Sequence, residues 1–155
     1  MMADAKLEIG DAAPDFALPG IGRRDYKLSE YLGQPVVLVF YPGDATPVCT
    51  MQLKSYSSGI HEFKDLNAVV LGISPQDVDS HEKFAADERL AMPLLYDEGK
   101  KVGERYSVLG PLGFYRRSIF VVNSEGKLTF VKRGYTGATF VGTDKLVAAV
   151  KAASA

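Results

Sequence analysis

Cysteine and histidine are scarce in this sequence, which has one cysteine, Cys49, and two histidines among 155 residues. A single cysteine cannot form an intramolecular disulfide, and the composition suits a reducing compartment, so we expect a cytoplasmic protein. So few thiol and imidazole groups nearly exclude a structural zinc site. Neither Gly-Lys pair completes a phosphate loop, because Leu94 and Val121 lie five residues before Gly99 and Gly126. The sequence therefore predicts neither a metal nor a nucleotide cofactor.

The sequence also lacks an excess of charge of one sign and any long apolar run. The net charge is -1, and the basic residues occur in scattered pairs such as Arg23-Arg24 and Lys100-Lys101 rather than as one patch. Nucleic acid is therefore not an expected partner. No segment reaches the roughly 20 apolar residues that span a bilayer, and the start of the chain lacks the apolar stretch of a secretory signal. We therefore expect no membrane association.

The residues that are present suffice for one hydrophobic core. Hydrophobic residues make up 46% of the chain, which is a content typical of a globular domain. No internal repeat, low-complexity tract or linker interrupts the sequence. We therefore predict a single domain over residues 1–155.

The most regular pattern in the chain is a buried strand followed by a helix. The run from Val36 to Tyr41 is continuous, β-branched and aromatic, which is typical of a strand covered on both faces. Pro42 follows it, Thr46 is a candidate N-cap, and Pro47 suits the first helical position. The predicted helix has one apolar stripe facing the sheet, with the cysteine in its first turn: Cys49, Leu53, Tyr56, Ile60 and Phe63.

The remaining patterns predict an α/β fold. Ser74-Pro75 repeats the sequence of a helix start and predicts a helix running to about Leu90. Residues 10–35 are interpreted as a loop, with a brief helix or strand at 26–32. Further strands are expected at 68–73, 94–96, 118–122 and 128–132, the last two as a hairpin, and further helices at 102–106 and 143–150. This order predicts a mixed central sheet flanked by helices, which is the thioredoxin-like arrangement with insertions.

Cys49 occupies a position that favours chemical reactivity. The reactive form of cysteine is the thiolate, which needs nearby positive potential because a free thiol has a pKa of about 8.5. The first turn of a helix provides unpaired N–H groups and the positive end of the helix dipole. A second source is an arginine just before the strand at 118–122. Arg116 and Arg117 are the candidates, and strand alternation allows only one of them to face the cysteine.

The segment FYPGDATPVCT matches the Pro-x-x-x-Thr-x-x-Cys signature of peroxiredoxins at Pro42, Thr46 and Cys49. Two further segments resemble this family: residues 13–16, Ala-Pro-Asp-Phe, and residues 117–122, an arginine followed by a strand. The resemblance covers about residues 8–150 and is strongest to the bacterioferritin-comigratory-protein or PrxQ group. It implies a thioredoxin-like fold and a thiol-dependent peroxidase that reduces hydrogen peroxide and organic hydroperoxides.

The same resemblance implies a role for each matching residue. Cys49 is the expected peroxidatic nucleophile, which passes through a sulfenic acid. Thr46 offers its hydroxyl to the peroxide, and Pro42 shields the pocket. Arg117, favoured over Arg116, holds the thiolate and stabilises the charge on the leaving oxygen. An external thiol such as thioredoxin, glutaredoxin or a small thiol then restores the cysteine, and the protein is expected to be a monomer or a homodimer.

Two residues depart from the pattern of this group. Many members have a resolving cysteine five residues after the first, where this chain has Lys54. A one-cysteine cycle is therefore implied. Val48 replaces the glycine often found before the cysteine, which narrows the expected pocket.

Simpler interpretations exist for each of these residues. A lone cysteine on an apolar stripe is commonly a buried packing residue, and Thr46-Pro47 is also an ordinary helix start. His61 and His81 are interpreted as surface residues on helices. A disulfide reductase or isomerase normally uses a Cys-x-x-Cys pair, which is absent here. A redox-inert module could instead bind a partner through a sheet edge or through the apolar loop at residues 109–115.

Overall fold

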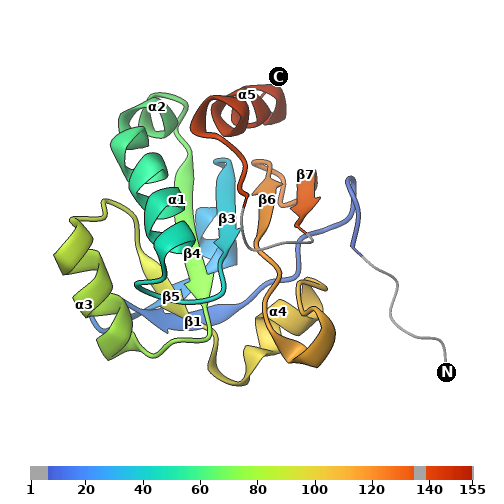
Figure 1. The fold of residues 1–155 in the computed structure, drawn as a ribbon. Helices are drawn as coiled ribbons and strands as arrows, with labels where there is room; N and C mark the ends of the chain where they lie inside the picture. The colour runs from blue at the N-terminus through green and yellow to red at the C-terminus, as the bar shows by residue number, and fades with distance from the viewer. Residues whose placement is uncertain (1–6, 135–138, 155) are drawn as a thin grey trace, which may run out of the picture.

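The computed structural model describes residues 7–134 and 139–154, which form a seven-stranded mixed sheet flanked by helices (Figure 1). The strand order is β2-β1-β5-β4-β3-β6-β7. The strands are β1 (Ala17–Gly20), β2 (Arg24–Lys27), β3 (Val36–Phe40), β4 (Val69–Ser74), β5 (Leu94–Tyr96), β6 (Ser118–Val122) and β7 (Leu128–Arg133). The helices are α1 (Pro47–Ser58), α2 (Ile60–Asp65), α3 (Val78–Glu88), α4 (Lys101–Arg105) and α5 (Thr143–Ala153), with short 3-10 turns η1 (Leu28–Tyr31), η2 (Glu98–Lys100) and η3 (Pro111–Gly113).

Strand β3 lies at the centre of the fold and is buried along its whole length. It pairs in parallel with β4 and antiparallel with β6. Because successive strand residues point to opposite faces, Val37 and Val39 belong to one core cluster while Leu38 and Phe40 belong to the other. This explains why the run from Val36 onward is apolar without alternation, as the sequence predicted.

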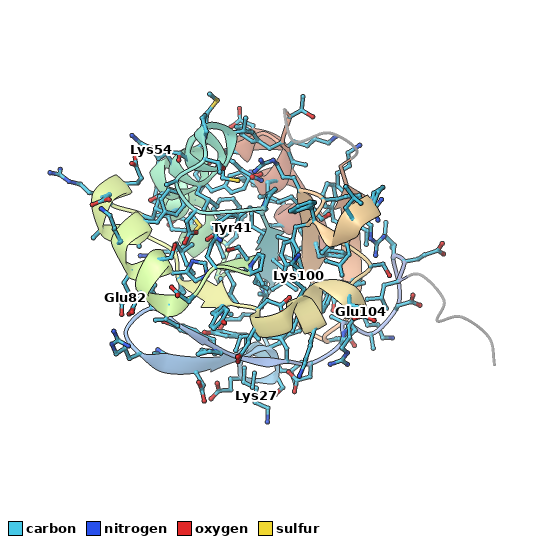
Figure 2. All side chains as sticks on the ribbon, turned by 60° about the horizontal axis from the view of Figure 1, so that its bottom comes forward. Lys27, Tyr41, Lys54, Glu82, Lys100 and Glu104 are labelled. Carbon is cyan, nitrogen blue, oxygen red and sulfur yellow. The ribbon has the colours of Figure 1, made fainter. Side chains whose placement is uncertain are left out.

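The two faces of the sheet are covered by different elements. Helices α1, α2, α3 and α5 pack on the face that holds Cys49, and α4 with residues 7–16 packs on the other (Figure 1). Figure 2 shows Tyr41 in the interior, whereas Lys27 and Lys54 lie at the periphery. Within the described residues, every helix is too short or too polar to cross a bilayer.

The prediction of a helix beginning at Ser74-Pro75 was wrong by several residues. Ser74 is the last residue of β4 and pairs with Tyr96 of β5. The helix α3 begins at Val78, after the N-cap Asp77, whose carboxylate accepts a hydrogen bond of 2.9 Å from the Ser80 N–H. An aspartate satisfies this unpaired donor of the first turn, which explains the position of the boundary.

The interpretation of residues 10–35 as a loop missed a hairpin, although the brief element expected at 26–32 is present as the end of β2 and the 3-10 turn η1. Strands β1 and β2 pair antiparallel across a turn in which Gly22 and Arg23 both have positive φ. A Cβ atom on Gly20 would lie 2.7 Å from the Leu94 carbonyl oxygen, so only glycine allows β1 to approach β5. These strands have four residues each, which is too short for the alternation of apolar residues to be recognised.

The central position of β3 leads to a stability prediction. Leu38→Ala removes a fully buried side chain and should lower the free energy of unfolding by about 2–5 kcal/mol. Leu112, which is 91% exposed, provides the control, and Leu112→Ala should change that free energy by at most about 0.5 kcal/mol. Urea denaturation followed by circular dichroism measures both values. Equal losses in the two variants would contradict the central role of β3.

Candidate active site

Cys49 lies in the first turn of α1, and its side chain is fully buried against the sheet. The helix begins where the sequence predicted, with Thr46 as the N-cap residue and Pro47 at the first helical position. The N-terminal end of a helix has unpaired N–H groups and a partial positive charge, both of which stabilise an anion. The local backbone therefore places positive potential at the sulfur.

Arg117 contacts the sulfur from the neighbouring strand. In the antiparallel pairing of β6 with β3, Ser118 lies opposite Phe40, so the residue before β6 lies beside the point where the chain leaves β3. The Arg117 Nη1 atom donates to Cys49 Sγ at 3.2 Å, and the side chain is only 6% exposed. Arg116 instead donates to the Ser107 carbonyl oxygen at 2.8 Å. Arg117 is thus the arginine that faces the cysteine.

Gln52 holds this arginine, a role that the sequence analysis did not assign. Its Oε1 accepts a 2.7 Å hydrogen bond from Arg117 Nη1, and its Nε2 donates to the Tyr56 hydroxyl at 3.2 Å. The Tyr56 hydroxyl donates to the Val141 carbonyl oxygen at 2.6 Å. Burial raises the pKa of Tyr56 to about 12, so this hydroxyl keeps its proton. The sequence does contain a signal that could have identified Gln52. It is a polar residue three positions after Cys49 and four before Tyr56, on the buried face of the helix.

Thr46 and Pro42 lie in the loop between β3 and α1. The Thr46 hydroxyl donates to the Gly43 carbonyl oxygen at 3.1 Å and does not cap the helix through its side chain. A hydroxyl has one proton to donate, so Thr46 in this orientation offers only an acceptor to another molecule. Pro42 is half-buried at the start of the same loop. The loop therefore brings both residues to the N-terminal end of α1.

The two histidines differ in their exposure to solvent, although both were expected to be surface residues. His61 is exposed on α2. His81 is fully buried in α3, so the expectation was wrong for this residue. Its Nδ1 lies 2.8 Å from Asp44 Oδ2. The acceptor that explains its burial is Asp44, thirty-seven positions earlier in the chain, and no helical periodicity relates the two residues.

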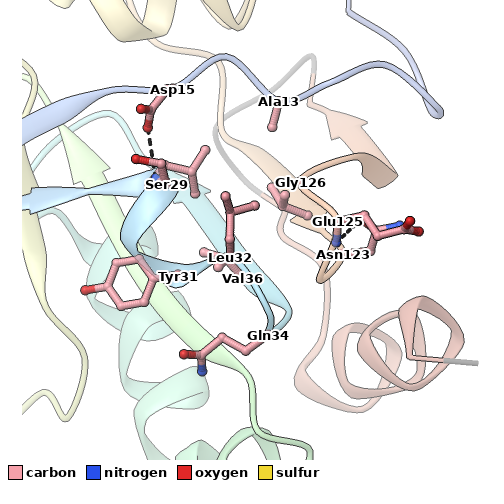
Figure 3. A pocket seen from close by; sticks show the side chains of 12 residues that line it. Ala13, Asp15, Ser29, Tyr31, Leu32, Gln34, Val36, Asn123, Glu125 and Gly126 are labelled. Carbon is pink, nitrogen blue, oxygen red and sulfur yellow. Dashed lines mark hydrogen bonds between the residues drawn. The ribbon is translucent and has the colours of Figure 1, made fainter.

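Two cavities lie at opposite ends of the sheet. One of about 190 Å³ borders Gln52 and Arg117. The other, of about 220 Å³, lies near Val36 and Val122, the residues of β3 and β6 farthest from Cys49 along these strands (Figure 3). Its described lining contains acids but no cysteine, histidine, lysine or arginine. The lining of this cavity therefore lacks the groups for thiol or anion chemistry. The candidate active site is at the opposite end of the sheet, where Cys49 lies.

The arrangement around Cys49 is suited to nucleophilic attack by sulfur. A guanidinium group and a helix N-terminus stabilise an anion, and burial strengthens both interactions by excluding water. Across residues 7–134 and 139–154, the histidine, cysteine and acidic side chains form no group of three or more that could hold a metal ion.

Comparisons with known proteins agree with this site. Residues 9–131 match the AhpC/TSA family. The chain is 42% identical over 130 residues to the putative peroxiredoxin bcp of Helicobacter pylori strain J99, covering 79% of this chain and 86% of that protein. Peroxiredoxin Bcp of Bacillus subtilis strain 168 is 37% identical over 130 residues, covering 79% and 82%.

A solved structure of the bacterioferritin comigratory protein of Xanthomonas campestris is similar to this one with a TM-score of 0.83 and 30% sequence identity. The match covers 96% of this chain and 98% of that protein. The thioredoxin-like fold and the resemblance to the Bcp/PrxQ group are thereby confirmed. The chain belongs to the AhpC/TSA family and is a peroxiredoxin, a thiol-dependent peroxidase.

Proposed function

We propose that Cys49 reduces hydroperoxides in a one-cysteine cycle that an external thiol completes. The main support is the 3.2 Å contact between Arg117 Nη1 and Cys49 Sγ in a buried setting. A positive group this close to the sulfur stabilises the thiolate before the reaction and the leaving oxygen during it. We also propose a cytoplasmic location, because a reducing compartment supplies the thiols that the cycle needs.

In the first step the Cys49 thiolate attacks one oxygen of the hydroperoxide. An S–O bond forms as the O–O bond breaks, and the leaving alkoxide or hydroxide takes up a proton to give an alcohol or water. Sulfur is oxidised by two electrons to the sulfenic acid. Arg117 donates toward the negative charge that develops, Thr46 accepts a hydrogen bond from the peroxide O–H, and Pro42 keeps water away from the sulfur.

The second half of the cycle depends on thiols from outside the chain. Cys49 is the only cysteine, and Lys54, at the position of a resolving cysteine, is exposed with its Nζ 3.5 Å from Glu88 Oε1. One external thiol condenses with the sulfenic acid to form a mixed disulfide and water, and a second thiol releases Cys49. Thioredoxin, glutaredoxin or a small thiol can act here, and the cycle is compatible with a monomer or a homodimer.

The proposed substrates include organic hydroperoxides as well as hydrogen peroxide. The Xanthomonas campestris relative is described as having alkyl peroxide reduction activity. Its match covers 96% of the length of the present chain. A comparison of rate constants for hydrogen peroxide and a simple alkyl hydroperoxide, with the external thiol varied in turn, tests both the substrate range and the reductant.

Cys49→Ser should reduce peroxidase activity to the background rate. Serine is nearly isosteric with cysteine, but its hydroxyl stays protonated at neutral pH and is a poor nucleophile. Peroxide consumption in the presence of excess thiol measures activity, and circular dichroism checks the fold. Activity retained in this variant would rule out Cys49 as the nucleophile.

Arg117→Ala should slow the reaction of Cys49 with peroxide by roughly 100- to 1000-fold, because it removes a donor to the developing charge. Arg116→Ala is the matched control, since Arg116 contacts the Ser107 carbonyl oxygen rather than the sulfur. Rapid-mixing kinetics of Cys49 oxidation gives both rate constants. Equal effects of the two substitutions would contradict a specific role of Arg117 at the sulfur.

Excess peroxide without thiol should convert wild-type Cys49 first to the sulfenic and then to the sulfinic acid. Lys54→Cys should give an intramolecular disulfide only if the first turn of α1 unwinds. Five helical residues span about 7.5 Å of axial rise, beyond the usual Cα separation of about 4.4–6.8 Å in a disulfide. Intact-protein mass spectrometry distinguishes the products. A disulfide-linked dimer as the main wild-type product would contradict the one-cysteine cycle.

A further inference from the structure

A buried carboxylate lies in the same loop as the proposed peroxide-binding residues. Asp44 follows Pro42 and Gly43, and its side chain is 4% exposed. Its Oδ1 accepts a 2.7 Å hydrogen bond from the Tyr41 hydroxyl, and its Oδ2 accepts one of 2.7 Å from the Ser80 hydroxyl. Burial, and then the charge of Asp44, raises the pKa of Tyr41 well above its ordinary value, so the Tyr41 hydroxyl remains a donor.

The third partner of this carboxylate is His81, whose ring nitrogens both face oxygen atoms. Nδ1 lies 2.8 Å from Asp44 Oδ2, and Nε2 lies 2.8 Å from the Leu95 carbonyl oxygen in β5. A carbonyl oxygen only accepts, so Nε2 has a proton. A second proton must lie between Nδ1 and Oδ2, because two lone pairs would otherwise face each other at this distance. The Asp44–His81 pair therefore links the loop to α3 and β5 through hydrogen bonds at both ring nitrogens.

The same loop is held at a second point by the segment before α3. Gln76 Oε1 accepts a 2.7 Å hydrogen bond from the Asp44 N–H. A Cβ atom on Gly43 would lie 2.7 Å from that oxygen, so the loop backbone packs directly against the Gln76 side chain. Ala45 adopts the left-handed conformation with φ of 61°, which is unfavourable for a residue with a Cβ atom. Strained conformations of this kind persist only where surrounding contacts impose them.

We infer that the Asp44–His81 pair is a positioning element for peroxide reduction, which imposes the loop conformation that directs the Thr46 hydroxyl at the peroxide. The inference rests on the proposed roles of Cys49 and Thr46. The pair acts through the loop: Asp44 precedes Ala45 and Thr46 in sequence, and the Thr46 hydroxyl is oriented by the Gly43 carbonyl oxygen. Arg117 reaches the sulfur from the position just before β6 and is held by Gln52 in α1, so its contact with Cys49 does not pass through this pair.

Three substitutions test this inference. Asp44→Ala and His81→Leu each break the link between the loop and α3, and each should lower the rate constant for peroxide reduction by about 10- to 100-fold, the effect of a displacement of about 1 Å. Asp44→Asn should restore most of the rate. Its carboxamide oxygen still accepts from Tyr41, and its NH2 group donates to Nδ1 of a neutral His81 that keeps its Nε2 proton for Leu95.

A second readout separates positioning from a general loss of structure. Alkylation of Cys49 by iodoacetamide needs the thiolate but no hydrogen bond to Thr46, so its rate should not fall in Asp44→Ala or His81→Leu. The matched control is Leu128→Ala, which removes a buried side chain of β7 in the opposite core cluster. It should lower the unfolding midpoint while keeping nearly the wild-type peroxide rate.

The possible results are distinct. A fall in peroxide rate without a fall in alkylation, together with rescue by Asp44→Asn, supports the inference. An unchanged peroxide rate, or a parallel fall in the rates of both reactions, overturns the inference. The proposed function of the wild-type protein is not affected by either result. A wild-type protein that does not reduce peroxide at Cys49 would instead refute the proposed function. His81→Leu leaves the buried Asp44 carboxylate without its ring partner and could prevent folding. Asp44→Ala removes that carboxylate, so its two rates test the inference if His81→Leu fails to fold.

Discussion

The hydrogen bond from Arg117 to the Cys49 sulfur is the interaction on which the rest of the site depends. It joins a helix N-terminus to the start of a strand that lies 68 positions later in the chain. The contact requires β6 to pair antiparallel with β3 in the observed register, with Ser118 opposite Phe40. A shift of one residue would turn Arg117 to the other face of the sheet, away from the sulfur. The reactivity of the thiol is therefore a property of the sheet as much as of the helix.

The side chains of Arg117, Gln52, Asp44 and His81 are buried, which makes each of their contacts important. Arg117, Gln52 and Tyr56 form a continuous chain of hydrogen bonds ending at the Val141 carbonyl oxygen. A second chain, through Asp44 and His81, ends at the Leu95 carbonyl oxygen. Polar groups without partners in such an environment would be costly, and satisfied ones are rigid. One network thus holds the arginine, and the other holds the loop that contains Thr46.

The success of sequence reasoning differed between parts of the fold for identifiable reasons. The strand from Val36, the start of α1 at Pro47 and the hairpin of β6 and β7 were predicted closely, because long apolar runs and turn residues are local signals. The hairpin of β1 and β2 was missed because four-residue strands show little periodicity. The start of α3 was misplaced because Ser74-Pro75 resembles a helix start, whereas the pairing of Ser74 with Tyr96 keeps it in β4.

The sequence by itself determined the α/β class, the position of Cys49 in the first turn of a helix and the family signature at Pro42, Thr46 and Cys49. These features depend on residues within a few positions of one another, whose preferences act locally. The family resemblance already favoured Arg117 over Arg116, but only the tertiary structure decided that Arg117 donates to the sulfur, that Gln52 holds this arginine and that His81 is buried against Asp44. The reason is that hydrogen bonds between distant elements depend on strand register and helix packing, which arise only when the whole core assembles.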